Sequence, residues 1–159
     1  MSPFSWRLTL NIQMVIKIEQ LEKLVHPNHV ELIRIYTREA NTLTEEITMT
    51  TGKAFDLLVE AEVGTALFGN SGPFTLQVII RDFTDNSMVI YTDALSDTFG
   101  GAWARLKEAF LFIVPANVID GRANHILEAD AILSADRAGS SKGKDVSFVR
   151  SRLFTASSP

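Results

Sequence analysis

Residues 53–64 read KAFDLLVEAEVG, and the alternation in this stretch decides the fold class. Every second residue from Phe55 to Val63 is apolar, and acidic residues occupy three of the four positions between them. Successive side chains of a β-strand point to opposite faces, so a period of two is typical of a strand with one face on a hydrophobic core. The stretch therefore predicts a half-buried β-strand.

The same period continues downstream. Residues 68–73 (FGNSGP) are rich in residues that break regular structure, and alternation resumes over residues 74–81. Residues 84–87 (TDNS) are typical of a turn, because Asn and Asp side chains can bond to their own backbone. A β-rich run over residues 88–92 follows directly. These segments predict a β-hairpin.

Short segments of this kind recur along most of the chain, separated by turn signals and without a regular alternation of strands and helices. Such a pattern indicates an antiparallel β-sandwich or barrel. We favour an immunoglobulin-like sandwich over residues 30–156, with a small β-barrel as the alternative fold. The expected strands are 30–38, 45–51, 53–64, 74–81, 88–92, 110–114, 127–133 and 146–155.

Residues 1–29 are expected to form an N-terminal extension with a short amphipathic helix. Between Met14 and Val25, apolar residues recur at spacings of four, three and four, which is the period of one helix face. The proline in residues 26–29 (HPNH) ends the helix, because the residue before a proline is disfavoured in the α region. The predicted fold class is therefore all-β, with one short helix before a single sandwich domain.

Composition excludes several classes of function. The net charge is −4, and the chain has no cysteine. Non-specific nucleic-acid binding depends on Lys and Arg side chains that neutralise phosphates, so no nucleic-acid partner is expected. Without cysteine there is no disulfide, thiolate nucleophile or Cys-ligated metal site. No apolar run approaches the roughly 20 residues of a membrane-spanning helix, and no signal-peptide pattern is visible, so we expect a cytoplasmic protein without a membrane span.

Candidate metal ligands are few. His26 and His29 lie three residues apart and could bind zinc or iron together with Glu31 or His125. Two histidines in a helix-to-strand turn are more simply explained as solvated side chains, and His125 as a turn or edge residue. No metal site and no cofactor are therefore expected.

Carboxylates occur in one predicted hairpin turn and on the predicted outward faces of several strands. Asp82, Asp85 and Asn86 crowd one hairpin, where turn formation explains them better than a calcium loop. Those on the alternating strands are expected on outward faces, in solvent, which argues against the opposed pair that a glycosidase needs. Arginines on neighbouring strands should form a surface ladder of ion pairs with some of them. The carboxylates are Asp56, Glu60, Glu62, Glu128 and Asp130, and the arginines are Arg81, Arg150 and Arg152.

Three aromatic residues lie in or beside predicted loops. Phe68, Phe99 and Trp103 could form a patch that binds a ligand or partner at one end of the sandwich. Large aromatic side chains are usually buried, so the alternative is that these three close the end of the core.

No catalytic motif outweighs a structural explanation of the same residues. The sequence therefore favours a non-enzymatic binding or protein-interaction module, which forms a homo-oligomer through the amphipathic helix or an open edge strand. The alternative is a small hydrophobic-ligand binder or an enzyme that uses a β-barrel interior, with polar groups such as Tyr91, His125 or Glu128. A barrel would enclose an apolar cavity, whereas the core of a sandwich would be filled.

Overall fold

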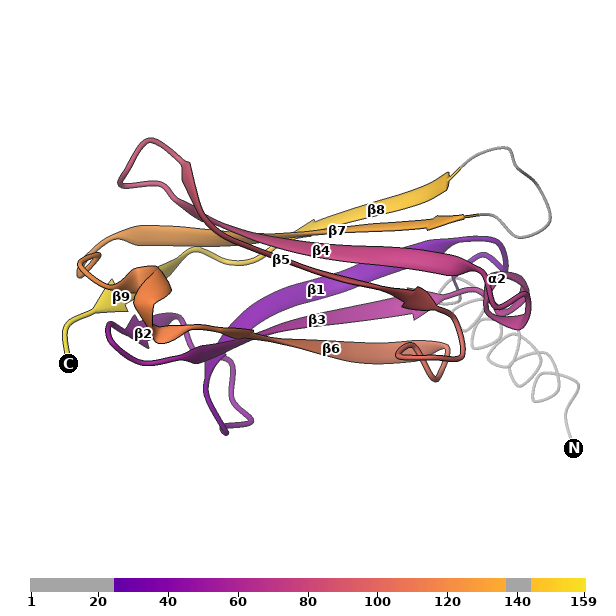
Figure 1. The fold of residues 1–159 in the computed structure, drawn as a ribbon, viewed down its shortest axis with the longest axis horizontal. Helices are drawn as coiled ribbons and strands as arrows, with labels where there is room; N and C mark the ends of the chain where they lie inside the picture. Colours follow the sequence, from indigo (N-terminus) through magenta and orange to yellow (C-terminus); the bar gives the residue numbers. More distant parts are fainter. Residues whose placement is uncertain (1–24, 137–143) are drawn as a thin grey trace, which may run out of the picture.

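Two β-sheets lie face to face in the computed structural model, which describes residues 25–136 and 144–159 (Figure 1). The described strands form these two sheets and do not close into a barrel. The predicted β-sandwich is thus confirmed, and the alternative of a small β-barrel is wrong. The predicted helix over residues 14–25 falls outside the described residues, apart from Val25.

The smaller sheet has three antiparallel strands in the order β1-β3-β6. They are β1 (Val30–Glu39), β3 (Phe55–Val63) and β6 (Lys107–Val114). At the centre of the sheet Val59 pairs with Ile35 on one side and with Phe110 on the other. All three side chains are buried against the second sheet, as the alternation in residues 53–64 predicts.

The larger sheet has the order β2-β9-β7-β4-β5, with β8 also paired to β7. Its pairs are antiparallel except for β2 with β9. The strands are β2 (Thr48–Thr50), β4 (Pro73–Asp82), β5 (Met88–Thr98), β7 (Ile126–Asp136), β8 (Lys144–Arg150) and β9 (Phe154–Ser157). The predicted hairpin is the β4–β5 pair, and β7 lies between β4 and β8, where the predicted ion-pair ladder requires it.

Two short helical segments connect strands, namely α2 (Thr65–Gly69) and the 3-10 helix η1 (Ala116–Ile119). Gly64 precedes α2, where the chain passes against the backbone of His26 and Pro27. A Cβ atom at Gly64 would lie 2.2 Å from the His26 carbonyl oxygen, so only glycine fits this crossing. The Pro27 carbonyl in turn accepts hydrogen bonds from the first backbone amides of α2, at 3.0 and 3.1 Å.

The space between the sheets is filled by side chains from both inner faces. Leu57 and Val59 of β3 are fully buried, as are Leu76 and Val78 of β4, and all four belong to one continuous core. This packing is that of a sandwich interior rather than of an enclosed ligand cavity.

Several predicted strand boundaries are wrong, among them the strand expected over residues 45–51, which is shortened to β2, and two of the differences have a clear cause. The strand expected over residues 146–155 is divided into β8 and β9 at Ser151, whose backbone and hydroxyl both bond to Ala129 of β7. The strand expected over residues 88–92 continues to Thr98, because β4 supplies pairing partners along its whole length. In both cases pairing with a strand distant in the sequence outweighs the local signal.

The two long sides of the sandwich are built differently. On one side β1 lies against β8, and side chains of β8 bond to the β1 backbone. The Val30 amide donates to Asp145 Oδ2 at 2.6 Å, and the Leu32 amide to Ser147 Oγ at 2.9 Å. On the other side lie the edge strands β5 and β6, which share no backbone ladder. We call these the closed side (β1 with β8) and the open side (β5 with β6).

Candidate functional site

The strand β6 presents an unpaired edge on the open side. It pairs with β3, and no other described strand pairs with it. The Val63 amide donates to the Leu106 carbonyl at 2.8 Å, and bonded positions alternate along an antiparallel pair. Even-numbered residues of β6 therefore bond to β3, and odd-numbered residues present their amides and carbonyls to the open side. In agreement, the Ala109 amide donates to the Glu108 side chain, at 3.3 Å.

The side chains along this edge are largely apolar. Leu111 is 50% exposed and Ile113 is 62% exposed. Both lie on the outer face of the three-stranded sheet, because they alternate with the core residues Phe110, Phe112 and Val114. An exposed apolar edge strand is a template for pairing with another strand.

A shallow hollow of about 300 Å³ lies beside this edge on the same outer face. It is bounded by Ile33 of β1, Glu60 of β3 and Lys107 of β6. Ala109 also lines the hollow, and its methyl side chain is too short to fill it. The edge thus combines projecting side chains with a depression two residues away.

Charged groups mark the two ends of the edge. Near the start of β6, the side chains of Arg105 and Lys107 are 79% and 68% exposed. Near its end, the Tyr91 hydroxyl of β5 donates to Asp93 at 3.1 Å and lies 3.5 Å from the Ile113 carbonyl oxygen. Burial of the ring, followed by the hydrogen bond to Asp93 and its charge, raises the pKa of Tyr91 to about 12. One end of the edge thus carries two exposed basic side chains, each paired with a glutamate (Arg105 with Glu108 at 3.4 Å, Lys107 with Glu62 at 3.2 Å), and the other end carries the carboxylate of Asp93.

The three aromatic residues predicted as a binding patch lie at the end of the sandwich where β4 begins. Phe99 and Trp103 are buried, and Phe68 is partly buried. Trp103 packs edge-on against three phenylalanine rings, with centroid separations of 5.2 Å. The three residues close the end of the core here, as the alternative explanation states, and partner binding by them stays a prediction that this geometry does not favour.

His26 and His29 lie at the start of β1 with exposed side chains. Their rings meet edge to face with centroids 4.8 Å apart, and His29 Nδ1 is 3.3 Å from Asp145 Oδ1. Within residues 25–136 and 144–159, no three His, Asp or Glu side chains are grouped so as to hold a metal ion. His125 lies at the opposite end of the sandwich, so the structure does not bring the three histidines together.

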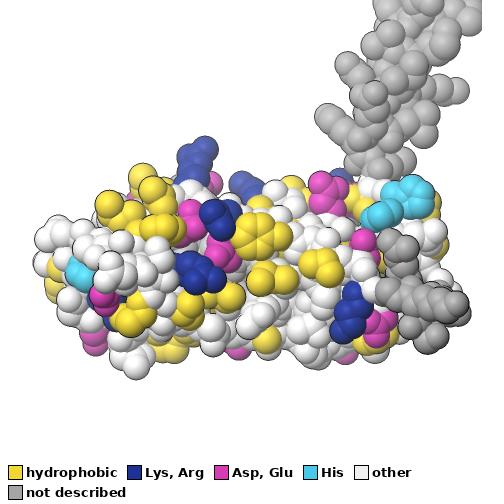
Figure 2. All heavy atoms as spheres, turned by 90° about the horizontal axis from the view of Figure 1, so that it is seen from above, with side chains coloured by type: hydrophobic (Ala, Val, Ile, Leu, Met, Phe, Trp, Pro, Cys, Tyr) yellow, Lys and Arg dark blue, Asp and Glu magenta, His cyan; other side chains and the backbone are white. Residues whose placement is uncertain are grey.

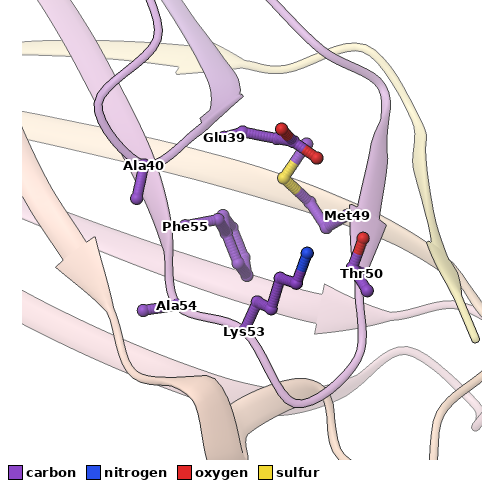
Figure 3. A pocket seen from close by; sticks show the side chains of 7 residues that line it. All are labelled: Glu39, Ala40, Met49, Thr50, Lys53, Ala54 and Phe55. Carbon is purple, nitrogen blue, oxygen red and sulfur yellow. The ribbon is translucent and has the colours of Figure 1, made fainter. Parts of the chain in front are cut away.

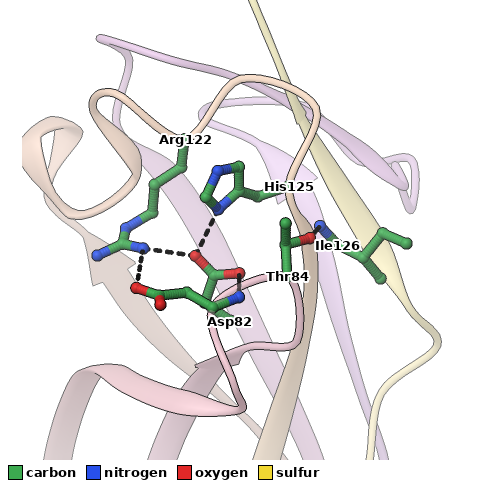
Figure 4. Close-up of polar contacts among 6 residues, drawn as sticks. Asp82, Thr84, Arg122, His125 and Ile126 are labelled. Atoms are coloured by element: carbon green, nitrogen blue, oxygen red, sulfur yellow. Dashed lines mark hydrogen bonds and ion pairs between the residues drawn. The ribbon is translucent and has the colours of Figure 1, made fainter.

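A buried carboxylate, Asp82, joins the β4–β5 hairpin to the loop before β7 (Figure 4). Its Oδ2 atom accepts hydrogen bonds from His125 Nδ1, at 2.7 Å, and from Arg122. Arg122 also lies 3.7 Å from Asp85, whose amide bonds to Asp82 at 3.1 Å. Burial opposes ionisation of Asp82, but the hydrogen bonds from His125 and Arg122 hold its pKa below the usual value. The contacts of Arg122 and His125 connect the loop before β7 to the hairpin, and the Asp85 amide closes the turn, which makes the cluster a structural junction.

The carboxylates on the outer faces are less exposed than the alternation predicts. They do lie on outward faces, but basic side chains cover them, so the expectation of solvent exposure is wrong for four of the five. The buried ones are Asp56, Glu62, Glu128 and Asp130, while Glu60 is partly buried. Figure 2 shows the outer face of the larger sheet, where basic and acidic side chains lie together among hydrophobic ones.

The predicted ladder is present on this face through Arg81 and Arg150, whereas Arg152 is exposed and takes no part in these ion pairs. Arg81 and Arg150 flank Asp130, each with an N–O distance of 3.1 Å, and Arg150 lies 3.2 Å from Glu128. Burial raises the pKa of Glu128, and the positive charge of Arg150 opposes this shift. Arg150 also lies over the Phe148 ring, 5.3 Å from its centroid. The arginines thus neutralise and cover the carboxylates at once.

A second hollow, of about 190 Å³, lies at the other end of the molecule from the aromatic cluster (Figure 3). Met49 and Phe55 form its buried floor, and Glu39, Thr50 and Lys53 stand around it. This volume is below the roughly 300–1,000 Å³ of most small-molecule sites, so we do not assign it a ligand.

Comparison with known proteins bears on the fold alone. No protein-family model matches the sequence, and no curated protein matches it. Among solved structures, the chain is similar to the C-terminal domain of wzt, with 10% identity and a TM-score of 0.52 over 82% of this chain and 74% of that one. It also aligns with red sea bream transglutaminase at 16% identity and a TM-score of 0.45, covering 89% of this chain and 18% of that one. The first likeness supports the β-sandwich.

None of the described helices is long and apolar enough to cross a membrane.

The sequence predicted a strand at residues 110–114 but did not identify it as an open edge. The available signal was the outward pair Leu111 and Ile113, which a central strand of a solvent-facing sheet would seldom carry.

Proposed function

We propose that this chain is a non-enzymatic protein-interaction module that binds an extended segment of its partner along the open edge of β6. The observation that carries the proposal is the combination of unpaired backbone groups with the exposed side chains of Leu111 and Ile113 on one strand. Strand addition uses both, since main-chain hydrogen bonds supply affinity and alternate side chains supply specificity. We further expect an immunoglobulin-like topology, a cytoplasmic location and no nucleic-acid partner.

The edges of β1 and β5 are better protected than that of β6. Side chains of Asp145 and Ser147 occupy two backbone amides of β1. On β5, the amides of Ala94 and Thr98 bond to the carboxylates that directly precede them, each at 2.8 Å. Charged groups that engage an edge in this way discourage the addition of another strand. On β6 the Ala109 amide bonds to Glu108 at 3.3 Å and the Tyr91 hydroxyl lies 3.5 Å from the Ile113 carbonyl oxygen, and both contacts are longer than those on β1 and β5.

The expected affinity depends on a few side chains. Full burial of an apolar side chain such as Leu111 or Ile113 contributes about 1.5–3 kcal/mol. Each 1.4 kcal/mol corresponds to about a tenfold change in the dissociation constant. Replacing Ile113 by lysine should therefore weaken binding of an added strand by tenfold or more.

A peptide-display experiment tests the proposal. The full chain is used to select from a library of random eight-residue peptides, and the selected peptides are measured against the parent, Ile113→Lys and Val146→Lys. Val146 is a matched control, because it is also 62% exposed but lies on β8 of the closed side. Peptides with alternating apolar residues should bind the parent and Val146→Lys, and lose at least tenfold in affinity for Ile113→Lys. Equal affinity for all three proteins, or no enrichment, would contradict the proposal.

A further inference from the structure

The geometry of β6 points to a specific partner. We propose that the added strand is β6 of a second copy of this chain, antiparallel to the first about a two-fold axis. In this arrangement Ala109 lies opposite Leu111 of the second copy, and Lys107 lies opposite its Ile113. The inference rests on the proposed function and names the partner for the same edge.

Backbone geometry selects this register. The outward-facing groups of β6 belong to Lys107, Ala109, Leu111 and Ile113, so an antiparallel copy must pair odd-numbered residues with odd-numbered ones. In the proposed register, each of these four residues is opposite one of the same four residues in the second copy. Sliding the second copy by two residues in one direction would place Pro115 opposite Lys107, and proline has no amide to donate. The opposite shift would require Arg105, which lies before the strand begins.

The shape of the edge is complementary to itself. Directly opposed residues of an antiparallel pair place their Cβ atoms about 4.5–5.5 Å apart on the same face. The small side chain of Ala109, beside the hollow of about 300 Å³, would therefore meet the projecting Leu111 of the second copy. The two-fold axis repeats the contact with the roles exchanged. Two half-exposed leucines are thereby covered without any side chain being moved into the core.

The charges at the ends of the edge are also complementary. Antiparallel pairing places Lys107 and the neighbouring Arg105 of one copy beside Ile113 of the other. There the Tyr91 hydroxyl and the exposed carboxylate of Asp93 lie against the end of β6. Within each copy Arg105 and Lys107 pair with Glu108 and Glu62, but both basic side chains stay largely exposed and can also face Asp93 of the second copy. The two-fold axis repeats this approach of opposite charges, which favours a second copy over an unrelated apolar strand.

The size of the contact sets the expected strength. Stable complexes bury about 1,200–2,000 Å² in total, and an interface centred on one strand pair lies at or below the lower limit. We therefore expect a monomer–dimer equilibrium with a micromolar dissociation constant rather than a permanent dimer.

Sedimentation equilibrium of the full chain over a wide concentration range tests the proposal. The parent and Val146→Lys should show the same dimer dissociation constant, and Ile113→Lys should raise it by tenfold or more. A parent that stays monomeric to millimolar concentration would overturn the inference, as would equal weakening by both substitutions. If selected peptides bind the β6 edge of a monomeric parent, the self-pairing is wrong while the proposed function stands.

Cysteine cross-linking tests the register and does not depend on Ile113→Lys folding. The chain has no cysteine, so Ala109→Cys and Leu111→Cys each carry a single thiol. Opposed residues at a hydrogen-bonded position have Cα atoms about 5.5 Å apart, within the range that a disulfide spans. Oxidation of an equal mixture should give mainly the mixed disulfide dimer. Faster dimer formation by Leu111→Cys alone, or none in any sample, would overturn the proposed pairing.

Discussion

The two long sides of the sandwich meet the same physical requirement in different ways. An edge strand has amides and carbonyls that no neighbouring strand satisfies. On the closed side, Asp145 and Ser147 of β8 satisfy amides of β1 directly. On the open side, β6 keeps apolar side chains and unpaired backbone groups. The comparison shows that a few short polar side chains at the right register can satisfy the amides of an edge strand, and that an edge without them keeps its backbone groups accessible.

The largest expected effect on the free energy of unfolding comes from removing the contact that joins β5 and the approach to β6 at one end of the open side. Phe99 and Trp103 are joined by an isolated β-bridge between the end of β5 and the approach to β6. Trp103→Ala should lower the free energy of unfolding by about 3–5 kcal/mol, because a large aromatic side chain leaves a cavity. Urea denaturation measures the change.

A matched substitution shows which part of Trp103 matters. The indole nitrogen is buried without a hydrogen-bond partner, so Trp103→Phe should retain more of the stability than Trp103→Ala. A loss of less than about 1 kcal/mol in Trp103→Ala would mean that the ring does not hold this side.

A smaller effect distinguishes the two sides directly. Asp145→Ala should cost about 1–3 kcal/mol, because the amide of buried Val30 loses its acceptor. Asp93→Ala on the open side should cost less than about 1 kcal/mol, since its carboxylate is exposed. Both values follow from urea denaturation at one protein concentration. Equal costs would refute the distinction between a sealed and an unsealed edge.

The smallest effect is a pH dependence on the open side. Burial and the Asp93 hydrogen bond raise the pKa of Tyr91 to about 12, so the folded state favours the neutral phenol. The resulting stability is fully present below about pH 10, the usual tyrosine pKa, and is lost as the pH rises through about 12.

Ultraviolet titration of tyrosinate in the parent and in Tyr91→Phe would isolate this group. The chain has two tyrosines, and burial also raises the pKa of Tyr36. A Tyr91 that ionises near pH 10 would show that the β5–β6 gap is open to water at that point.

The sequence predicted those features that depend on neighbouring residues. The period of two located β3 and β4 and assigned their inner faces correctly, because burial of alternate side chains is a local signal. The position of β7 between β4 and β8 could also be inferred, since its carboxylates require basic neighbours. The barrel alternative arose because strand counts do not determine how sheets close.

The open edge could not be predicted in the same way. Whether β6 is central or at an edge depends on its pairing with β3, which is far from it in the sequence. The prediction that the outward carboxylates are exposed to solvent was wrong for a related reason. Asp130 is covered by Arg81 and Arg150, and the length of an arginine side chain lets it lie across a neighbouring strand.

The aromatic enclosure around Trp103 makes the protein its own optical probe. The chain has two tryptophans, and replacing Trp6 by phenylalanine would leave one indole, surrounded by Phe74, Phe99 and Phe110. An indole shielded from water fluoresces at shorter wavelength than a hydrated one. Its emission would therefore report, in real time and without a label, when the β5–β6 end of the sandwich opens.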